Sequence, residues 1–233
     1  MLRLLVDDGP LTATEIAARM GMHQSSVSRS LSALAAAGYV RKGAHGRFEC
    51  YFGVLGMVDS IGRQPLVQQL RAGVKKIIND YSDITIAICM LWQHEVLHLL
   101  RARSNSVFLP LWHGGIPLNV STPGLRLLLD LPESEAIAIL ERSRERLGWG
   151  GRSDKVPESA AETLARARAG LADDVLLLRG WWQEERTTGA IMIRTAEPSP
   201  VALAVVDETE QLDAAEHTLL LHRVRRDLES QLD

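Results

Sequence analysis

Residues 11–50 read LTATEIAARMGMHQSSVSRSLSALAAAGYVRKGAHGRFEC, and this stretch decides the fold of the first part of the chain. Thr12 precedes Glu15 by three residues, which is the spacing of a capping box at a helix start. Gly21 follows the apolar-periodic segment and is a typical helix terminator, because glycine adopts the left-handed backbone conformation without steric cost. A second helix is expected over about 22–37, so the two form a helix-turn-helix.

The second expected helix has one apolar side and one small, polar side. Val27, Leu31 and Leu34 recur with helical spacing and predict the buried side. A helix enters the DNA major groove only where its exposed side lets the backbone come close, and serine permits this approach. Glutamine and arginine can also form bidentate contacts with base edges. The candidate DNA-contacting residues on this helix are Gln24, Ser25, Ser26, Ser28 and Arg29.

A basic hairpin is expected directly after the second helix. Two β-prone runs, 39–42 and 47–52, flank the turn-forming residues 43–46. Cationic side chains on such a wing would lie over phosphates or reach the minor groove. A polar helix side or a basic hairpin alone is usually only a solvated surface, so the order of these elements is what indicates DNA binding. The candidate wing residues are Arg41, Lys42, His45 and Arg47.

Composition and charge set limits on the rest. The 233 residues are 46% hydrophobic and 24% charged, which is typical of a globular protein with a real core. Residues 1–55 hold six Lys/Arg against four Asp/Glu and so carry a charge of +2. The remainder carries −5, which gives the net charge of −3. This fits a nucleic-acid contact made by one end only, although so small a difference also fits chance.

The cysteines and the apolar runs indicate a cytoplasmic protein. Cys50 and Cys89 are too few for a disulfide framework or a cysteine-based zinc site, and each lies in an apolar run. No run approaches the roughly 18 apolar residues of a membrane span. The segment 1–9 contains two aspartates and lacks the basic region and long apolar core of a signal peptide.

The chain after the hairpin has an α+β pattern. We expect a winged helix-turn-helix over 1–55, a linking helix over 56–80 in which Pro65 marks a break or a first turn, and a larger domain over 81–233. In that domain, β-rich runs and amphipathic segments alternate without an internal repeat. The fold class is therefore α+β, with a mainly antiparallel sheet flanked by helices.

One motif suggests an enzyme. His94-Glu95-Val96-Leu97-His98 matches the His-Glu-x-x-His pattern of zinc hydrolases, in which a helix brings both histidines to one metal. Here the motif lies in a segment that favours two strands around a turn at Gln93-His94. Histidines four residues apart on a strand are separated by about 13 Å, too far to share zinc. We therefore expect no metal, no catalytic residue and no cofactor.

Three segments resemble the IclR family of bacterial transcriptional regulators. They are LTATEIAARMGMHQSSVSRSLSALAAAGYVRKGAHGRFECYFGV at 11–54, LPLWHGGIPLNVSTPGLRLLLDLPESEAIAIL at 109–140 and SPVALAVVDETEQLDAAEHTLLLHRVRRDLESQL at 199–232. The resemblance implies a GAF-like effector domain with a small-molecule pocket between its sheet and the loop before Pro123. It also implies small organic or aromatic acids as effectors. A lone winged helix reads few base pairs, so a homodimer or dimer of dimers on a palindromic double-stranded operator is expected.

Ser121 and Thr122 can cap the helix that begins near Pro123, and the free N–H groups of that helix would attract a carboxylate. The alternative is that Ser121 is a cap only. Any of the five tryptophans, at 92, 112, 149, 181 and 182, belongs either to the pocket or to the core. The effector-binding residues expected from alternation and resemblance are His98, Leu100, Asn119, Ser121, Thr122 and Met192.

The sequence therefore predicts an effector-modulated DNA-binding regulator that is not an enzyme, with repression or activation left open. Three alternatives remain. The body could serve only for oligomerisation, the 94–98 motif could bind zinc, or the head could have lost DNA affinity. The last arises because only MLRLLVDDGP precedes Leu11, where family members usually carry a longer first helix. That shortness indicates either an internal start or a weakened DNA-binding domain.

Overall fold

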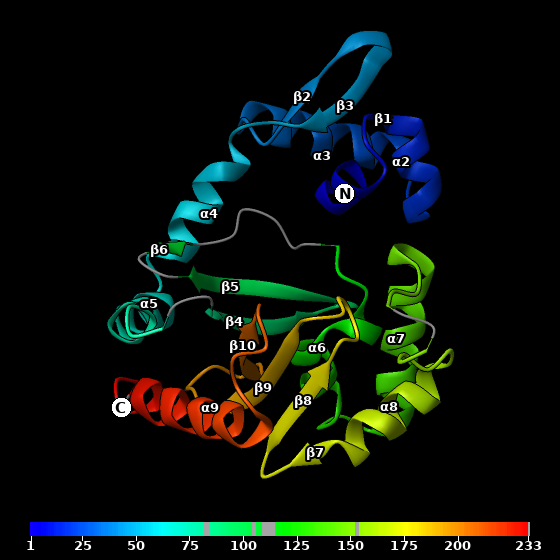
Figure 1. Cartoon of the computed structure of the whole chain (residues 1–233). Helices are drawn as coiled ribbons and strands as arrows, with labels where there is room; N and C mark the ends of the chain where they lie inside the picture. The colour runs from blue at the N-terminus through cyan, green and yellow to red at the C-terminus, as the bar shows by residue number, and fades with distance from the viewer. Residues whose placement is uncertain (82–83, 104–105, 109–114, 152–153, 233) are drawn as a thin grey trace. The chain divides into compact units, whose positions relative to one another are not determined.

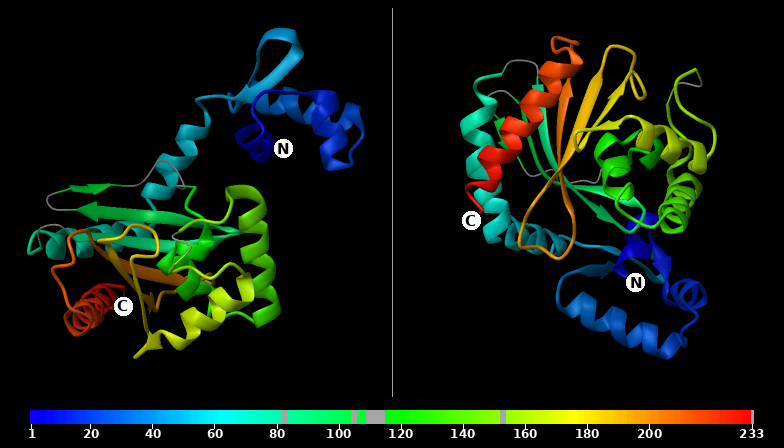
Figure 2. Two further views of the ribbon diagram at one scale, coloured as in Figure 1. Left: turned by 45° about the vertical axis from the view of Figure 1, so that its right-hand side comes forward. Right: turned by 90° about the horizontal axis from the view of Figure 1, so that it is seen from below.

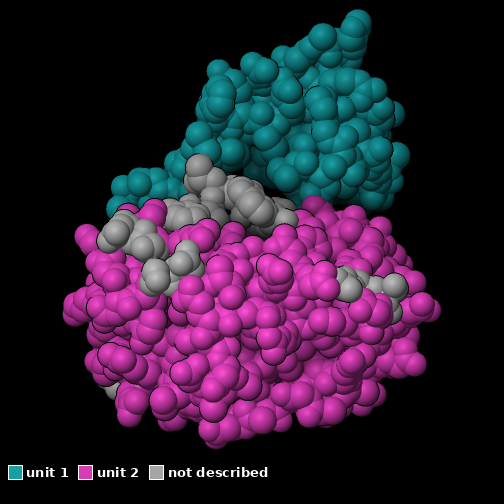
Figure 3. Space-filling view, in the orientation of Figure 1, with its two compact units in different colours: residues 1–64 teal, residues 65–233 magenta. Residues whose placement is uncertain are grey.

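A computed structural model describes residues 1–81, 84–103, 106–108, 115–151 and 154–232. The chain divides into two compact units, Met1–Gln64 and Pro65–Asp233, which we call the head and the body (Figure 3). The division lies within 56–80, where the sequence predicted one linking helix. Pro65 begins a new helix there, as expected of a residue that lacks a backbone N–H and suits the first helical turn.

The head is the predicted winged helix-turn-helix (Figure 1). Its three strands pair in the order β1-β3-β2, so that β2 and β3 form the wing directly after α3. The elements are α1 Leu2–Asp7, β1 Leu11–Thr12, α2 Ala13–Met20, α3 Gln24–Ala36, β2 Val40–Lys42, η1 Ala44–Gly46, β3 Arg47–Cys50 and α4 Val54–Gly62.

Local signals set the helix boundaries in the head. The capping box is confirmed, because Thr12 Oγ1 accepts a hydrogen bond from the Glu15 amide at 3.2 Å and Glu15 Oε2 accepts one from the Thr12 amide at 2.7 Å. Gly21 ends α2 with a φ of 62°, as predicted. The core beneath these helices contains Ile16, Val27 and Leu31, which are fully buried, together with Leu5 from the short α1.

The body contains one antiparallel sheet of seven described strands in the order β6-β5-β4-β10-β9-β8-β7. The predicted α+β class is confirmed. None of the described helices is long and apolar enough to cross a membrane. The elements are α5 Pro65–Ile78, β4 Ile84–Trp92, β5 Glu95–Arg103, β6 Ser106–Phe108, η2 Leu118–Val120, α6 Thr122–Leu128, α7 Glu133–Leu147, α8 Ala160–Ala169, β7 Leu171–Ala172, β8 Val175–Arg179, β9 Thr187–Ile193, β10 Val201–Asp207 and α9 Ala214–Glu229.

Helices cover the two faces of this sheet differently. Helices α5 and α9 lie side by side on one face, and α6, α7 and α8 lie on the other (Figure 2). In β10, the large residues Leu203 and Val205 face the α5/α9 side, whereas the small residues Ala202 and Ala204 alternate with them. Ala87 of β4 and Ala190 of β9 pair with Ala204 in one row. This row of alanines leaves room against the face that α6 covers.

A β-bulge in β5 decides which side chains face α6. Ile88 pairs with Leu100 and the next residue, Cys89, pairs with His98, so Leu99 is an extra residue without a partner in β4. Leu99 and Leu100 both pack on the α5/α9 side. As a consequence His98 and Arg101, three residues apart, face the same side of the sheet.

Candidate functional site

The exposed side of α3 carries the polar residues expected to meet DNA. Gln24, Ser25 and Arg29 are exposed, and Ser26 and Ser28 are half-buried. Ser25 and Arg29 lie opposite the buried apolar side of α3, which holds the helix on the core of the head. Arg29 forms no ion pair or hydrogen bond with any described residue. Its guanidinium is therefore available for a bidentate contact with a base or a phosphate.

The wing presents its cations on short, braced strands. Arg41 Nε lies 2.7 Å from Glu49 Oε1 on the paired strand, and its guanidinium lies 5.5 Å from the ring centre of Tyr51. The Arg41 side chain is still 59% exposed. Lys42 and His45 are exposed as well, and His45 lies at the turn with a φ of 56°. The contact of these three side chains with phosphates stays a prediction.

Arg47, the fourth wing residue expected to contact DNA, is held within the head. Its Nη1 donates to the Pro10 carbonyl at 2.7 Å, and its two terminal nitrogens lie 3.1 and 3.2 Å from the Glu15 carboxylate. Hydrogen bonds from Thr12 hold the pKa of Glu15 below its usual value, and Arg47 adds to this effect. Arg47 thus ties the base of the wing to the start of α2, which favours a positioning role. Its phosphate contact stays a prediction.

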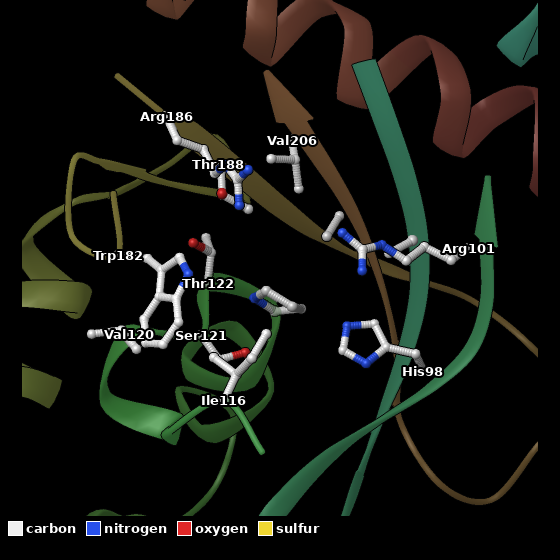
Figure 4. Close-up of a pocket in the computed structure, with 13 residues that line it drawn as sticks. His98, Arg101, Ile116, Val120, Ser121, Thr122, Trp182, Arg186, Thr188 and Val206 are labelled. Atoms are coloured by element: carbon white, nitrogen blue, oxygen red, sulfur yellow. The ribbon is translucent and has the colours of Figure 1, made fainter. Parts of the chain in front are cut away.

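The body contains a cavity of about 90 Å³ between the sheet and the start of α6 (Figure 4). Strands β4, β5, β9 and β10 form its floor, while η2, α6 and the segment before β9 close it. The residues that line it are Ala87, His98, Arg101, Ile116, Val120, Ser121, Thr122, Pro123, Trp182, Arg186, Thr188, Ala204 and Val206.

The lining is cationic. It includes Arg101 and Arg186 and no carboxylate. Arg186 Nη2 is paired with Glu208, which lies outside the lining, whereas Arg101 has no ion pair or hydrogen bond with any described residue. Burial, together with the neighbouring charge of Arg101, lowers the pKa of His98 to about 4. The imidazole is therefore neutral at pH 7, and Arg101 is the uncompensated charge of the cavity.

Three of the six residues expected in an effector pocket line this cavity: His98, Ser121 and Thr122. Ser121 is also the predicted cap, since its Oγ accepts a hydrogen bond from the Gly124 amide at 3.2 Å. Helix α6 has only seven residues. Its dipole is accordingly a weaker source of attraction for an anion than the arginine across the cavity.

The other three expected residues lie elsewhere. Leu100 is fully buried on the opposite face of the sheet, because the extra residue Leu99 reverses the alternation on which the expectation depended. Asn119 is 1% exposed and uses its amide on the backbone of Gly150, donating at 2.7 Å and accepting at 3.1 Å. Met192 lies four residues beyond Thr188 on β9 and does not line the cavity.

Sequence reasoning missed Arg101 and Arg186. Simple alternation from His98 turns Arg101 away from the pocket, and only the bulge reverses this. The sequence signal that could have identified Arg101 was its position as a cationic residue within an apolar strand.

Of the tryptophans considered, Trp182 lines the cavity and is 42% exposed, Trp181 is buried in the core, and Trp112 lies outside the described residues.

The 94–98 motif has the strand geometry that the sequence predicted. Residues 93–94 form the turn between β4 and β5, with a φ of 57° at Gln93, and the motif continues along β5. Glu95 is 3% exposed and lies 2.7 Å from Arg146 Nε on α7. No group of three metal-ligating side chains occurs among the residues that the structure describes. The helix that a zinc hydrolase needs at this motif is replaced by a hairpin.

A family model described as the MarR family matches residues 1–47, which lie within the head. No curated protein sequence matches the chain.

Solved structures match the whole chain in fold. The IclR family transcriptional regulator from Brucella abortus is 20% identical with a TM-score of 0.70, and the match covers 96% of this chain and 86% of that one. An IclR homolog from Microbacterium hydrocarbonoxydans complexed with 4-hydroxybenzoate is 19% identical with a TM-score of 0.56, covering 96% and 91%. IclR of Thermotoga maritima is 13% identical with a TM-score of 0.54, covering 99% and 95%. The resemblance predicted from the sequence is thus confirmed in the fold.

Proposed function

We propose that the chain is a DNA-binding transcriptional regulator whose affinity for its operator is changed by a small organic or aromatic acid. One observation carries the proposal. The same chain has a winged head and a body cavity, and Arg29 of the head and Arg101 of the cavity each pair with no residue that the structure describes. Control of DNA binding by an acid requires two distinct sites, one for the DNA and one for the acid.

In this proposal α3 enters the major groove and the wing lies along the backbone. Gln24 and Arg29 contact base edges, while Ser25, Ser26 and Ser28 contact bases or phosphates. Arg41, Lys42 and His45 lie near phosphates and account for most of the salt dependence. Arg47 supports the wing through Glu15.

A second copy of the chain completes the DNA-binding unit. Large apolar side chains at and just before α4 are exposed: Phe52 by 72%, Leu55 by 52% and Ile61 by 49%. Such a cluster is unusual on a surface without a partner and supports α4 as a contact between two copies. Two heads related by two-fold symmetry would read a palindromic operator, as a homodimer or a dimer of dimers.

The effector acts by a population shift. A small acid bound in the cavity favours one arrangement of the paired heads and so changes their fit to the spacing of the half-sites. A solved structure with this fold holds 4-hydroxybenzoate, which supports an acid as the ligand class. The chain carries out no reaction in this proposal, and it works in the cytoplasm, where bacterial operators are found.

The competing proposal is a body that only oligomerises. The cavity is lined by an arginine that pairs with no described carboxylate, which favours effector binding over oligomerisation alone. A purely structural core would not retain a partly buried charge without a partner. The two proposals differ in whether any small acid changes the affinity for DNA.

Fluorescence anisotropy tests the proposal on DNA from upstream of the chain's own gene, with a scrambled duplex as the control. We expect binding that prefers the upstream duplex and weakens steeply as salt rises. Equal, weak binding to both duplexes would contradict it. Repeating the titration with the coding sequence extended upstream would then separate a short start from a head that does not read DNA.

A further inference from the structure

The two arginines of the cavity are in different electrostatic states. Arg101 extends from β5, while Arg186 lies across the cavity, just before β9, near Thr188 (Figure 4). Arg186 Nη2 is paired with the Glu208 carboxylate, whose side chain is 14% exposed. Glu208 also lies 3.5 Å from the Thr85 hydroxyl, which donates to it. The charge of Arg186 is therefore cancelled within the protein.

Arg101 has no such compensation. No described carboxylate pairs with it, and its neighbour on the same face, His98, is neutral at pH 7. A partly buried cation without a counter-ion is costly, and it gains most from an anion that enters the cavity. Counted over the described residues, the cavity therefore has one positive charge that no carboxylate balances.

We propose that the cavity selects acids with a single carboxylate and rejects dicarboxylates of the same skeleton. Arg101 binds the carboxylate, and the Arg186–Glu208 pair forms a neutral wall at the other end. The inference deepens the proposed effector function and rests on it, since it specifies the ligand of the same cavity.

Glu208 is the residue that sets this selectivity. A second carboxylate reaching Arg186 would have to approach the Glu208 carboxylate or displace it, and two like charges in one partly buried site are strongly unfavourable. A neutral oxygen would meet a different situation. Arg186 Nε is buried and has no hydrogen-bond partner among the described residues, so it can donate to a hydroxyl or carbonyl oxygen of the ligand.

Four-carbon acids are suitable probes, because the cavity of about 90 Å³ is smaller than the roughly 150 Å³ cavities that admit benzene. We would titrate the full chain at pH 7.5 with 4-hydroxybutanoate, butanoate and succinate, following the melting temperature and calorimetric binding. The hydroxy monocarboxylate should bind about tenfold or more tightly than the dicarboxylate.

Substitutions assign this preference to residues. Glu208→Gln should reduce the preference to near unity or reverse it, because Arg186 then becomes available to a second carboxylate. Glu210→Gln is the matched control, since Glu210 also pairs with an arginine, but that arginine, Arg179, lies outside the cavity lining, whereas Arg186 is part of it. If Glu208→Gln does not fold, Arg186→Gln provides the second variant. It should keep monocarboxylate binding and reject dicarboxylates more strongly than the wild type.

Three results would overturn the inference: a dicarboxylate that binds the wild type as tightly as its monocarboxylate, a preference that Glu208→Gln leaves unchanged, or no binding by any probe at 50 mM. DNA anisotropy on the same preparations distinguishes failure of the charge selectivity from failure of the proposed function. Loss of charge selectivity with intact operator binding rejects only this inference, whereas absence of operator binding rejects the proposed function itself.

Discussion

In the winged head and in the cavity of the body, an arginine tied to a glutamate accompanies an arginine that pairs with no described residue. In the head these are Arg47, which is paired with Glu15, and Arg29. In the cavity they are Arg186, which is paired with Glu208, and Arg101. Of these four arginines, we propose that the two without a described partner bind ligand, while the two paired ones set the shape or the charge of their sites.

The largest expected effect is at Arg101. Arg101→Gln should weaken binding of the best monocarboxylate probe by about 2–5 kcal/mol, because the carboxylate loses its only uncompensated cation. The melting temperature of the ligand-free protein should stay unchanged or rise, since an unpaired, partly buried charge is removed. Calorimetry and thermal melting check the two parts.

Arg103→Gln, on the same strand but outside the cavity lining, is the control for this variant. Equal loss of acid binding in both variants would show that general positive charge, and not the position of Arg101, holds the ligand.

His98 should make the stability of the body sensitive to acid. Its pKa in the folded protein is about 4, below the ordinary value of 6.5, so the unfolded chain binds more protons between these values. Stability is therefore complete above pH 6.5 and falls as the pH drops toward 4, by up to about 3 kcal/mol for a shift of this size.

His98→Gln should remove this part of the pH dependence, as measured by denaturant unfolding at pH 4.5 and pH 7.5. The matched variant His45→Gln, on the exposed wing, should leave it in place. An identical pH dependence in wild type and His98→Gln would show that His98 is not the group responsible.

The Arg29→Ala variant tests the arginine of α3 that pairs with no described residue. Arg29→Ala should weaken operator binding by about 1–3 kcal/mol and relax specificity at the base it contacts. The fold should be unaffected, because Arg29 is exposed and forms no ion pair or hydrogen bond with described residues. Anisotropy on the operator and on single-base variants measures both effects, and a uniform loss on all sequences would instead place Arg29 on a phosphate.

The smallest effect is expected at Arg47. Comparing it with Arg41 distinguishes an arginine that supports the base of the wing from one that reaches phosphate. Arg47→Ala should lower the free energy of unfolding of the head by about 1 kcal/mol or less, since its ion pair is partly exposed. Arg41→Ala should instead reduce the slope of log affinity against log salt by about 1. If Arg47→Ala reduces that slope equally with no loss of stability, then Arg47 contacts phosphate after all.

The head could be predicted from the sequence because its signals are local. Thr12 and Glu15 cap α2 three residues apart, and Gly21 ends the helix with its own backbone. The body required information from outside each segment. Whether Leu100 or Arg101 faces the cavity depends on a bulge that exists only where β5 pairs with β4.

The electrostatic state of the cavity was equally hidden. Arg186 and Glu208 are 22 residues apart, and only the folded sheet makes them partners. Ser121 was found because a cap is a local feature, whereas the hydrogen bonds of Asn119 could not be predicted because Gly150, its partner, is 31 residues away. Sequence patterns therefore predicted the elements of the head more completely than the lining of the cavity.

The central claim is that an acid bound at Arg101 controls a head that binds DNA through Arg29. Anisotropy on operator DNA tests it most directly, with wild type and Arg101→Gln each titrated with and without the acid that raises the melting temperature. We predict that the acid changes the operator affinity of the wild type about fivefold or more and leaves that of Arg101→Gln unchanged. An acid that changes both proteins equally, or neither, would contradict the account.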